Sequence, residues 1–329
     1  HDSKLSILDY PVVFDDDLYF TFEIQSRIKV LEIYEKEASP WLKLLFGEDE
    51  FVAFNSMQRQ NLDFQSLNDY NVIIINEIDE IHSGLQLQLS AFTDQGGSLV
   101  LLPSQKNTQA YAMIASNYGF NYDLSQDTAK TRVFSVDESD KLFKDVFVKI
   151  PENADFPTVF KHFSMHLQNA SSAKILIQLL NGNPFLISNV AGNGKVYAFS
   201  SPIQLTWTDF QRNSLFVPVW YRILLMSIRN APLYYNLGEE VIIATPYHQT
   251  TGEKILKFRS LSSDFEIIPE HRNRNNSAEV LIHDVIPTAG QFALFSSDSL
   301  TQMLSFNFNR KESILTYFQA DELLNSAIL

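Results

Sequence analysis

The stretch NVIIINEIDEIHSGLQLQLSAFTDQGGSLVLLPSQKNTQAYAMIASNYGF, residues Asn71–Phe120, decides the fold. Val72–Ile75 and Ser98–Leu102 are short apolar runs rich in branched side chains, a pattern typical of strands buried on both faces. A helical pattern of apolar residues separates these two runs, and Asn107–Tyr118 predicts a second helix. Strand, helix, strand and helix joined by short links predict parallel strands connected by right-handed crossovers.

The carboxyl ends of these strands are where chemistry is expected, because ligands of parallel sheets bind beyond them. In this chain those places are Asn76–Glu80 and Pro103–Thr108. The first loop carries an acidic group, Glu77, Asp79 and Glu80, and paired carboxylates can act as general acid and base. Neither a partner nucleophile nor a sugar-binding pattern accompanies them in the sequence, so they are catalytic candidates and no more.

The composition excludes several classes of function. The net charge is −14, from 25 basic and 39 acidic residues. Nucleic acid is therefore not expected as a partner, because phosphate binding needs clustered lysine and arginine. The chain has no cysteine, which removes disulfides, thiolate metal sites and cysteine nucleophiles but does not fix the compartment.

Membrane attachment is not visible in the chain itself. No apolar run reaches the roughly 18 residues that a membrane-spanning helix requires. The chain begins at His1 within strand-rich sequence, which we interpret as a piece of a longer or processed protein. Any contact with a membrane is expected through segments of the parent protein outside this chain.

Three regions are predicted from changes in pattern along the chain. Residues 1–27 contain two short strands that we expect to belong to another sheet, and whether they join a carboxyl-terminal one stays open. Residues 28–232 form the predicted α/β domain. Residues 233–329 are strand-sized runs split by polar turns, a pattern typical of an antiparallel β-sandwich.

The second half of the α/β domain has a different pattern from the first. Asn181-Gly182-Asn183 and Asn193-Gly194 stand between apolar runs and predict tight hairpin turns. Trp207–Arg229 predicts a long helix that packs on the sheet.

Several local motifs resemble those of a known protein family. They are DYP (9–11) with FD (14–15) and YF (19–20), DQGGSLV (94–100), IPEN (150–153) with FP (156–157), GKVY (194–197), LFVP (215–218), and SFN (305–307) with RKES (310–313). Through these motifs the chain resembles the BatA-like envelope proteins of the Bacteroides aerotolerance type. The order of elements from Arg27 to about Asn230 also resembles the class I glutamine amidotransferase-like, flavodoxin-like α/β fold.

The resemblance implies a parallel sheet with helices on both faces, followed by an antiparallel β-sandwich. It implies a membrane-anchored parent protein, with this chain on the periplasmic side of the inner membrane and protein partners in the bacterial envelope. A link to aerotolerance or envelope stress follows from the same resemblance. No cofactor is expected.

The active site of an amidotransferase is not reproduced in this sequence. Such an enzyme needs a cysteine on a strand-to-helix elbow, with a histidine and an acid behind it. The corresponding elbow is Leu102–Lys106, where Ser104 stands near the place of the nucleophile. Pro103 fixes its own φ angle and lacks an N–H, so we interpret Ser104 as a turn or helix-cap serine. The histidine is also missing, because Ser200-Ser201-Pro202 stands at its expected place.

His162 and His166 are candidate metal ligands. With a spacing of four they would share one face of a helix and could hold Zn²⁺. Phe163 occupies the place of the metalloprotease glutamate and no third ligand is obvious nearby, so ordinary histidines are the simpler interpretation.

The sequence favours a non-catalytic protein-interaction or scaffold module, because the expected nucleophile and base are both missing. An envelope glycan hydrolase that uses the acidic edge is the alternative, and it needs two carboxylates roughly 5–9.5 Å apart across a cleft. A sugar- or peptide-binding module is a further alternative, and exposed tryptophans along a groove would favour it.

Overall fold

The structure is a computed structural model of the chain. It describes residues 2–8, 16–22, 27–106, 108–144, 146, 155–168, 173–228, 232–245, 256–274, 277–283, 286–297 and 299–309. Four of the motifs that carry the family resemblance, at positions 9–11, 14–15, 150–153 and 310–313, lie outside these residues.

The chain divides into two compact units. The central unit is Gln25–Arg229, and the terminal unit joins His1–Ile24 to Asn230–Leu329. The sequence places these boundaries after residues 27 and 232. The amino-terminal strands therefore share a unit with the carboxyl-terminal strands, a point that the sequence left open.

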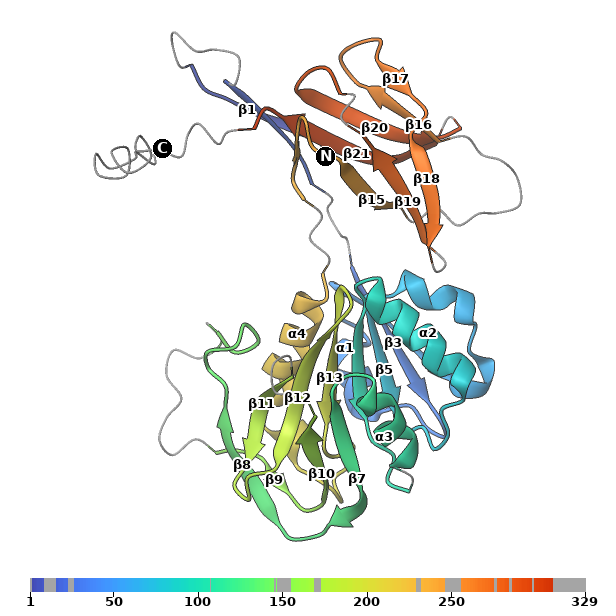
Figure 1. Ribbon diagram of the computed structural model, residues 1–329. Helices are drawn as coiled ribbons and strands as arrows, with labels where there is room; N and C mark the ends of the chain where they lie inside the picture. Colours follow the sequence, from blue (N-terminus) through green and yellow to red (C-terminus); the bar gives the residue numbers. More distant parts are fainter. Residues whose placement is uncertain are drawn as a thin grey trace, which may run out of the picture. The chain divides into compact units, whose positions relative to one another are not determined.

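A nine-stranded mixed sheet forms the centre of the central unit, and Figure 1 shows its strands side by side. In spatial order the strands are β4 (Val52–Gln58), β3 (Ile28–Tyr34), β5 (Val72–Asn76), β6 (Ser98–Leu102), β13 (Gly194–Phe199), β12 (Pro184–Ala191), β11 (Lys174–Leu179), β8 (Thr131–Val136) and β9 (Thr158–Val159). The strands from β4 to β13 run parallel. The remaining four continue the sheet in antiparallel pairing.

This topology shows that the expected fold class is wrong. A flavodoxin-like or class I glutamine amidotransferase-like domain has a parallel sheet whose strands are joined by helices, whereas nearly half of this sheet is antiparallel. The physical reason is local, because β11, β12 and β13 are joined by tight turns that are too short for a parallel crossover. Strands also outnumber helices among the described residues.

Helices cover only part of the sheet. They are α1 (Pro40–Phe46), α2 (Ser83–Asp94), α3 (Gln109–Ser116) and α4 (Phe216–Met226). α1 and α4 pack into the apolar core on one face, and α2 and α3 pack into the core on the other. The ribbon formed by β7 (Phe120–Asp127) and β10 (His162–Leu167) contributes to that second core, where β10 lies against β12.

Both hairpins predicted in the central unit are confirmed. Gly182 has a φ of +87° in the turn between β11 and β12, a conformation that glycine adopts at little cost. Asn193 and Gly194 lead from β12 into β13. The backbone at Gly194 approaches Gly97 so closely that a Cβ there would lie 2.0 Å from the Gly97 carbonyl oxygen.

The long helix expected over Trp207–Arg229 is wrong in its first half. A short 3₁₀ helix, η3 (Phe210–Arg212), precedes α4, which begins at Phe216. The Thr208 hydroxyl donates to the carbonyl of Thr158 at 2.9 Å and accepts from the N–H of Phe210 at 3.1 Å. These side-chain bonds compete with helical backbone bonds and hold the segment in a turn.

Besides a two-stranded amino-terminal sheet, the described part of the terminal unit contains two sheets that share one apolar core. The first is β14 (Tyr235–Asn236), β21 (Ser299–Asn307), β20 (Gly290–Ser296), β16 (Leu256–Ser260) and β17 (Glu266–Ile267), and the second is β15 (Val241–Thr245), β19 (Ser277–Ile282) and β18 (Glu270–Arg274). The pair β14–β21 is parallel, so this unit is not the wholly antiparallel sandwich that was expected.

The amino-terminal hairpin lies against β21. It is formed by β1 (Asp2–Ser6) and β2 (Asp17–Thr21). The Asn307 amide donates to the Tyr19 carbonyl at 2.7 Å and accepts from the Tyr19 N–H at 2.8 Å. The Asn307 side chain thus forms the two backbone hydrogen bonds that a neighbouring strand would form with Tyr19, and it holds β2 in this unit.

Candidate functional site

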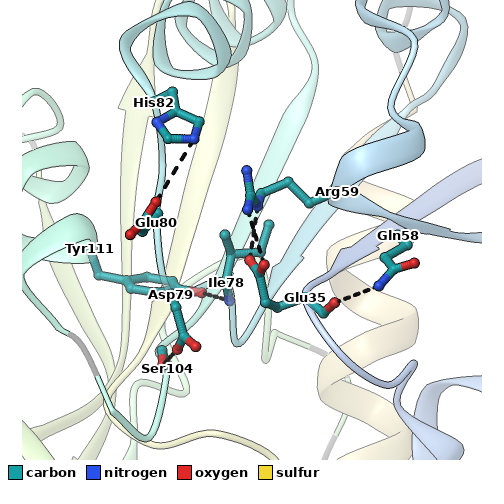
Figure 2. Close-up of polar contacts among 9 residues, drawn as sticks. All are labelled: Glu35, Gln58, Arg59, Ile78, Asp79, Glu80, His82, Ser104 and Tyr111. Carbon is teal, nitrogen blue, oxygen red and sulfur yellow. Dashed lines mark hydrogen bonds and ion pairs between the residues drawn. The ribbon is translucent and has the colours of Figure 1, made fainter.

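The candidate site lies at the carboxyl ends of the parallel strands. The chain passes from β3 to β4 on one side and then returns to β5 on the other side of β3. The loops after β3 and β5 therefore leave the sheet at a point where the strand order reverses. Such a switch point is the usual ligand position of an open sheet built from parallel strands. Figure 2 shows the polar side chains that meet there.

Ser104 is enclosed by its own loop. Its hydroxyl donates to Asp79 Oδ1 at 2.5 Å and accepts from the N–H of Lys106 at 3.1 Å (Figure 2 shows the first bond). Only 1% of the Ser104 surface is exposed. A nucleophile must reach its substrate, so this geometry fits a serine that stabilises a turn and ties the loop after β6 to the loop after β5.

Glu77 has a strained backbone and a carboxylate held by amides. Its φ is +50°, a value that residues other than glycine rarely adopt. Its two carboxylate oxygens accept from Gln105 Nε2 and Gln204 Nε2, each at 2.6 Å. Gln105 Oε1 in turn accepts from the indole N–H of Trp207 at 3.1 Å. The first residue after β5 is therefore fixed to the loops after β6 and β13.

The three acidic residues of the loop after β5 have different partners. Glu77 is held by its two glutamines and Asp79 by Ser104. Glu80 is exposed and lies 4.0 Å from the ring of His82, which is also exposed (Figure 2). The sequence placed these three carboxylates together, but the structure directs them to separate neighbours.

Two more contacts fix this edge, and sequence reasoning missed both. Arg59 donates twice to the Glu35 carboxylate, at 2.9 and 3.0 Å, so the residue after β3 is clamped to the residue after β4. The Ile78 N–H donates to the Tyr111 hydroxyl at 2.8 Å, which ties the loop after β5 to α3 (Figure 2). Burial raises the pKa of Tyr111, so this hydroxyl stays protonated at neutral pH.

A buried carboxylate lies beneath the edge. Glu32 on β3 is fully buried, and its oxygens accept from the Ser39 N–H, the Ser56 hydroxyl and the Asn76 amide, each at 2.7 Å. Burial raises the pKa of Glu32, and the three donors oppose that shift. The only sequence signal of this residue is a glutamate within the apolar run IKVLEIY. Its bonds join β3, β4, β5 and the start of α1.

His162 and His166 do not form a metal site of the expected kind. They lie on strand β10 and not on a helix, with a register irregularity between Phe163 and Met165. His162 is fully buried, whereas His166 is exposed and pairs with Asp123 at 3.1 Å. Within the described ranges, no group of three histidine or carboxylate side chains is arranged to hold a metal ion.

His162 contacts the antiparallel half of the sheet. Its Nε2 lies 3.3 Å from the amide nitrogens of Asn181 and Asn183 in the β11–β12 turn, and 3.8 Å from Asp127 Oδ2. Its Nδ1 is buried and has no hydrogen-bond partner among the described residues. Burial lowers the pKa of His162, and the charge of Asp127 opposes this effect.

The tryptophans do not form an exposed binding platform. Trp207 and Trp220 are buried, at 2% and 0% exposure. Trp41 is partly buried against the core, and the Arg212 guanidinium lies 6.0 Å from its ring centroid. The condition set for a sugar- or peptide-binding groove is therefore not met by Trp207 or Trp220.

No helix of the described part of the chain combines the length and the apolar character needed to cross a membrane.

Comparisons with known proteins give a likeness of fold and no family. No protein-family model matches the chain, and no curated protein sequence matches it. Among solved structures it is similar to two proteins of Salmonella typhimurium described as cytoplasmic, STM3548 (17% identity, TM-score 0.50, covering 60% of this chain and 98% of that one) and STM1381 (14% identity, TM-score 0.50, 61% and 100%). A β-galactosidase of Bacillus circulans sp. alkalophilus matches more weakly, with 12% identity and a TM-score of 0.44 over 78% of this chain and 41% of that one. At such low identity the likeness to the two Salmonella proteins concerns the fold alone.

Proposed function

We propose that this chain is a non-catalytic protein-interaction module of a membrane-anchored protein of the bacterial envelope, located on the periplasmic side. The resemblance of its sequence to BatA-like envelope proteins supports the location and suggests a link to aerotolerance or envelope stress. The partners are other proteins of the envelope.

One observation carries the non-catalytic part of the proposal. At the edge where a ligand is expected, the reactive side chains are occupied by neighbouring loops. Ser104 is buried and bonded to Asp79, and the Glu77 carboxylate is held by Gln105 and Gln204. These bonds make the edge a rigid framework, which suits a surface that presents fixed loops to a partner.

A glycan hydrolase finds less support in this geometry. Such an enzyme needs two carboxylates that face each other across a cleft with room for a sugar. Glu77, Asp79 and Glu80 are instead directed toward glutamines, a serine and a histidine. We therefore do not extend the proposal to hydrolysis.

The proposal is tested by two measurements on the intact protein. The full-length parent protein is cross-linked in envelope membranes and captured by its tag, and an unrelated bait with the same tag is captured in parallel. We expect the parent protein alone to recover a specific protein partner, in an amount close to its own. Hydrolysis of nitrophenyl esters and glycosides is measured for the wild type and for Ser104→Ala and Glu77→Gln, and no difference is expected. Turnover that either substitution abolishes would contradict a non-catalytic role, and capture of the same proteins by both baits would contradict the interaction role.

A further inference from the structure

Strand β4 is an edge strand of the central sheet. It pairs with β3 on one side, and no strand of the described residues pairs with its other side. The Ile28 N–H donates to the Phe51 carbonyl at 2.8 Å, which fixes the direction of the backbone groups along β4. Because this direction alternates from one residue to the next, the N–H and C=O groups of Val52, Phe54 and Ser56 point away from β3. These groups are available to an extended backbone outside the sheet.

The outer side of β4 lacks the features that keep edge strands from pairing. Proteins usually protect such a strand by making it short, or by charged residues, proline or a bulge. β4 has seven residues, VAFNSMQ, with no charged residue and no proline, and its register with β3 is uninterrupted. The strand at the other end of the same sheet, β9, has only two residues. The edge strand β18 of the terminal unit, EHRNR, is charged.

The outer side of β4 is also accessible. Asn55 and Ser56 in the middle of the strand are exposed, and Phe51 immediately before it is 72% exposed. The segments before and after β4 lie on the two faces of the sheet. α1 packs into the core on one face, and η2 (Phe64–Asp69) contributes Leu67 to the core on the other. The outer side of β4 lies between these two layers.

The charges at the two ends of β4 favour a second copy of this chain in antiparallel orientation. The acidic run Glu48–Glu50 precedes the strand. Arg59 follows it and is paired with Glu35, so the charges of these two residues at that end are balanced. Antiparallel pairing places the acidic end of one copy beside the balanced end of the other. Parallel pairing would place two acidic ends side by side, and like charges opposite each other are destabilising.

We infer that two copies of this chain pair through β4 in antiparallel orientation, around a twofold axis at Asn55, and so join their central sheets. Asn55 is the midpoint of the strand, so this register pairs all seven residues. Phe54 then lies opposite Ser56, and Ala53 lies opposite Met57. The outward groups of Phe54 and Ser56 exchange both hydrogen bonds of an antiparallel pair. Such a contact is self-complementary, because every interaction occurs twice about the axis.

This inference concerns a second copy of the chain and not the envelope partners of the proposed function, so either can fail without the other. Sedimentation equilibrium of the whole chain tests it. A reversible dimer with a dissociation constant of about 10–100 µM is expected, because a single pair of strands is a small interface. A chain that is still monomeric at about 1 mM would overturn the inference.

Amide hydrogen exchange tests the direction of the backbone groups. The N–H groups of Phe54 and Ser56 should exchange more slowly as the protein concentration rises, because they become bonded only in the dimer. Those of Ala53 and Asn55 already face β3 and should change little. Exchange at Phe54 and Ser56 that is independent of concentration, in a sample that sedimentation shows to be dimeric, would overturn the pairing through β4.

Charged substitutions at the axis make the test specific. Asn55→Lys and Asn55→Glu should each weaken the dimer about fivefold or more, because like charges then meet across the axis. An equimolar mixture of the two variants should regain the affinity, and this recovery also shows that both are folded. Ser125→Lys, at an exposed residue of β7, is the matched control and should leave association unchanged. A dimer that neither Asn55 variant weakens, or that the mixture does not restore, would contradict the inference.

Discussion

Glu77 and Gln204 lie 127 positions apart in the sequence, and the Gln204 amide donates to the Glu77 carboxylate at 2.6 Å. This bond joins the loop after β5 to the loop after β13, across β6. It also lies beside a backbone strained at Glu77, where φ is +50°. The hydrogen bonds of the side chain therefore maintain a conformation that the backbone alone would avoid.

This relationship predicts different results for two substitutions of Glu77. Glu77→Ala should destabilise the central unit by about 1–3 kcal/mol, because two amides lose their acceptor while the positive φ remains. Glu77→Gly loses the same bonds but relieves the strain, so it should be more stable than Glu77→Ala by about 1 kcal/mol. Urea unfolding followed by tryptophan fluorescence measures this, since Trp41, Trp207 and Trp220 all lie in the central unit. An alanine variant at least as stable as the glycine variant would show that the strain is absent in solution.

Glu32 is expected to make stability fall as pH rises. The pKa of Glu32 is raised in the folded state from an ordinary value of 4.5. The Glu32 carboxyl therefore stays protonated in the folded chain at a pH where it has lost the proton in the unfolded chain. The stabilisation is complete below pH 4.5 and is lost as the pH rises through the folded-state pKa. Glu32→Gln has no proton to lose and should remove this contribution. The measurement is the free energy of unfolding of the wild type and of Glu32→Gln, from below pH 4.5 upward. The fall in stability with rising pH should be smaller in Glu32→Gln.

The neighbours of Glu32 provide a second comparison. Glu32→Ala leaves the Ser39 N–H, the Ser56 hydroxyl and the Asn76 amide without their acceptor, and should cost about 3 kcal/mol or more. Glu32→Gln keeps a polar partner for them and should cost less. If Glu32→Ala and Glu32→Gln lower the free energy of unfolding equally, the three donors must form hydrogen bonds with water in the alanine variant.

His162 is expected to act on stability in the opposite direction. Burial lowers its pKa from the ordinary value of 6.5, so between the two values the unfolded chain binds a proton that the folded chain does not. The contribution of neutral His162 to the free energy of unfolding is therefore fully present above pH 6.5, and it is lost as the pH drops toward the lowered pKa. His162→Gln should flatten this part of the urea-midpoint profile, and His166→Gln is the control for the loss of an exposed imidazole from the same strand. A profile that His162→Gln leaves unchanged would contradict the burial seen here.

The sequence could predict those parts of the fold that depend on neighbours in the chain. Val72–Ile75 and Ser98–Leu102 are strands as predicted, because an apolar run between turn signals has a local cause. The turn at Gly182 was predicted for the same reason. The fold class was wrong although these hairpin signals were visible, because the parallel pattern of the first half was extended over an antiparallel second half.

The candidate site depended on contacts that no local pattern reveals. A spacing of four residues between His162 and His166 fits a helix and a strand alike, and the register irregularity in β10 decides which histidine is buried. Ser104 was interpreted as a turn or helix-cap serine from its local sequence, and in the structure its hydroxyl accepts from the nearby N–H of Lys106. The bonds of Glu77 with Gln105 and Gln204 join distant loops, and no single sequence shows such a pairing.

The close approach of two glycines gives a prediction with an internal control. A Cβ at Gly194 would lie 2.0 Å from the Gly97 carbonyl oxygen and 2.7 Å from that of Thr93, both of them backbone atoms. Gly194→Ala should therefore separate β13 from the end of α2 and cost more than about 3 kcal/mol. Gly84→Ala meets no atom within 4 Å and lies in α2, so it should be neutral or stabilise by up to about 1 kcal/mol. Urea unfolding of the two variants measures both effects, and similar stabilities would mean that the two backbones are farther apart in solution than in the structure.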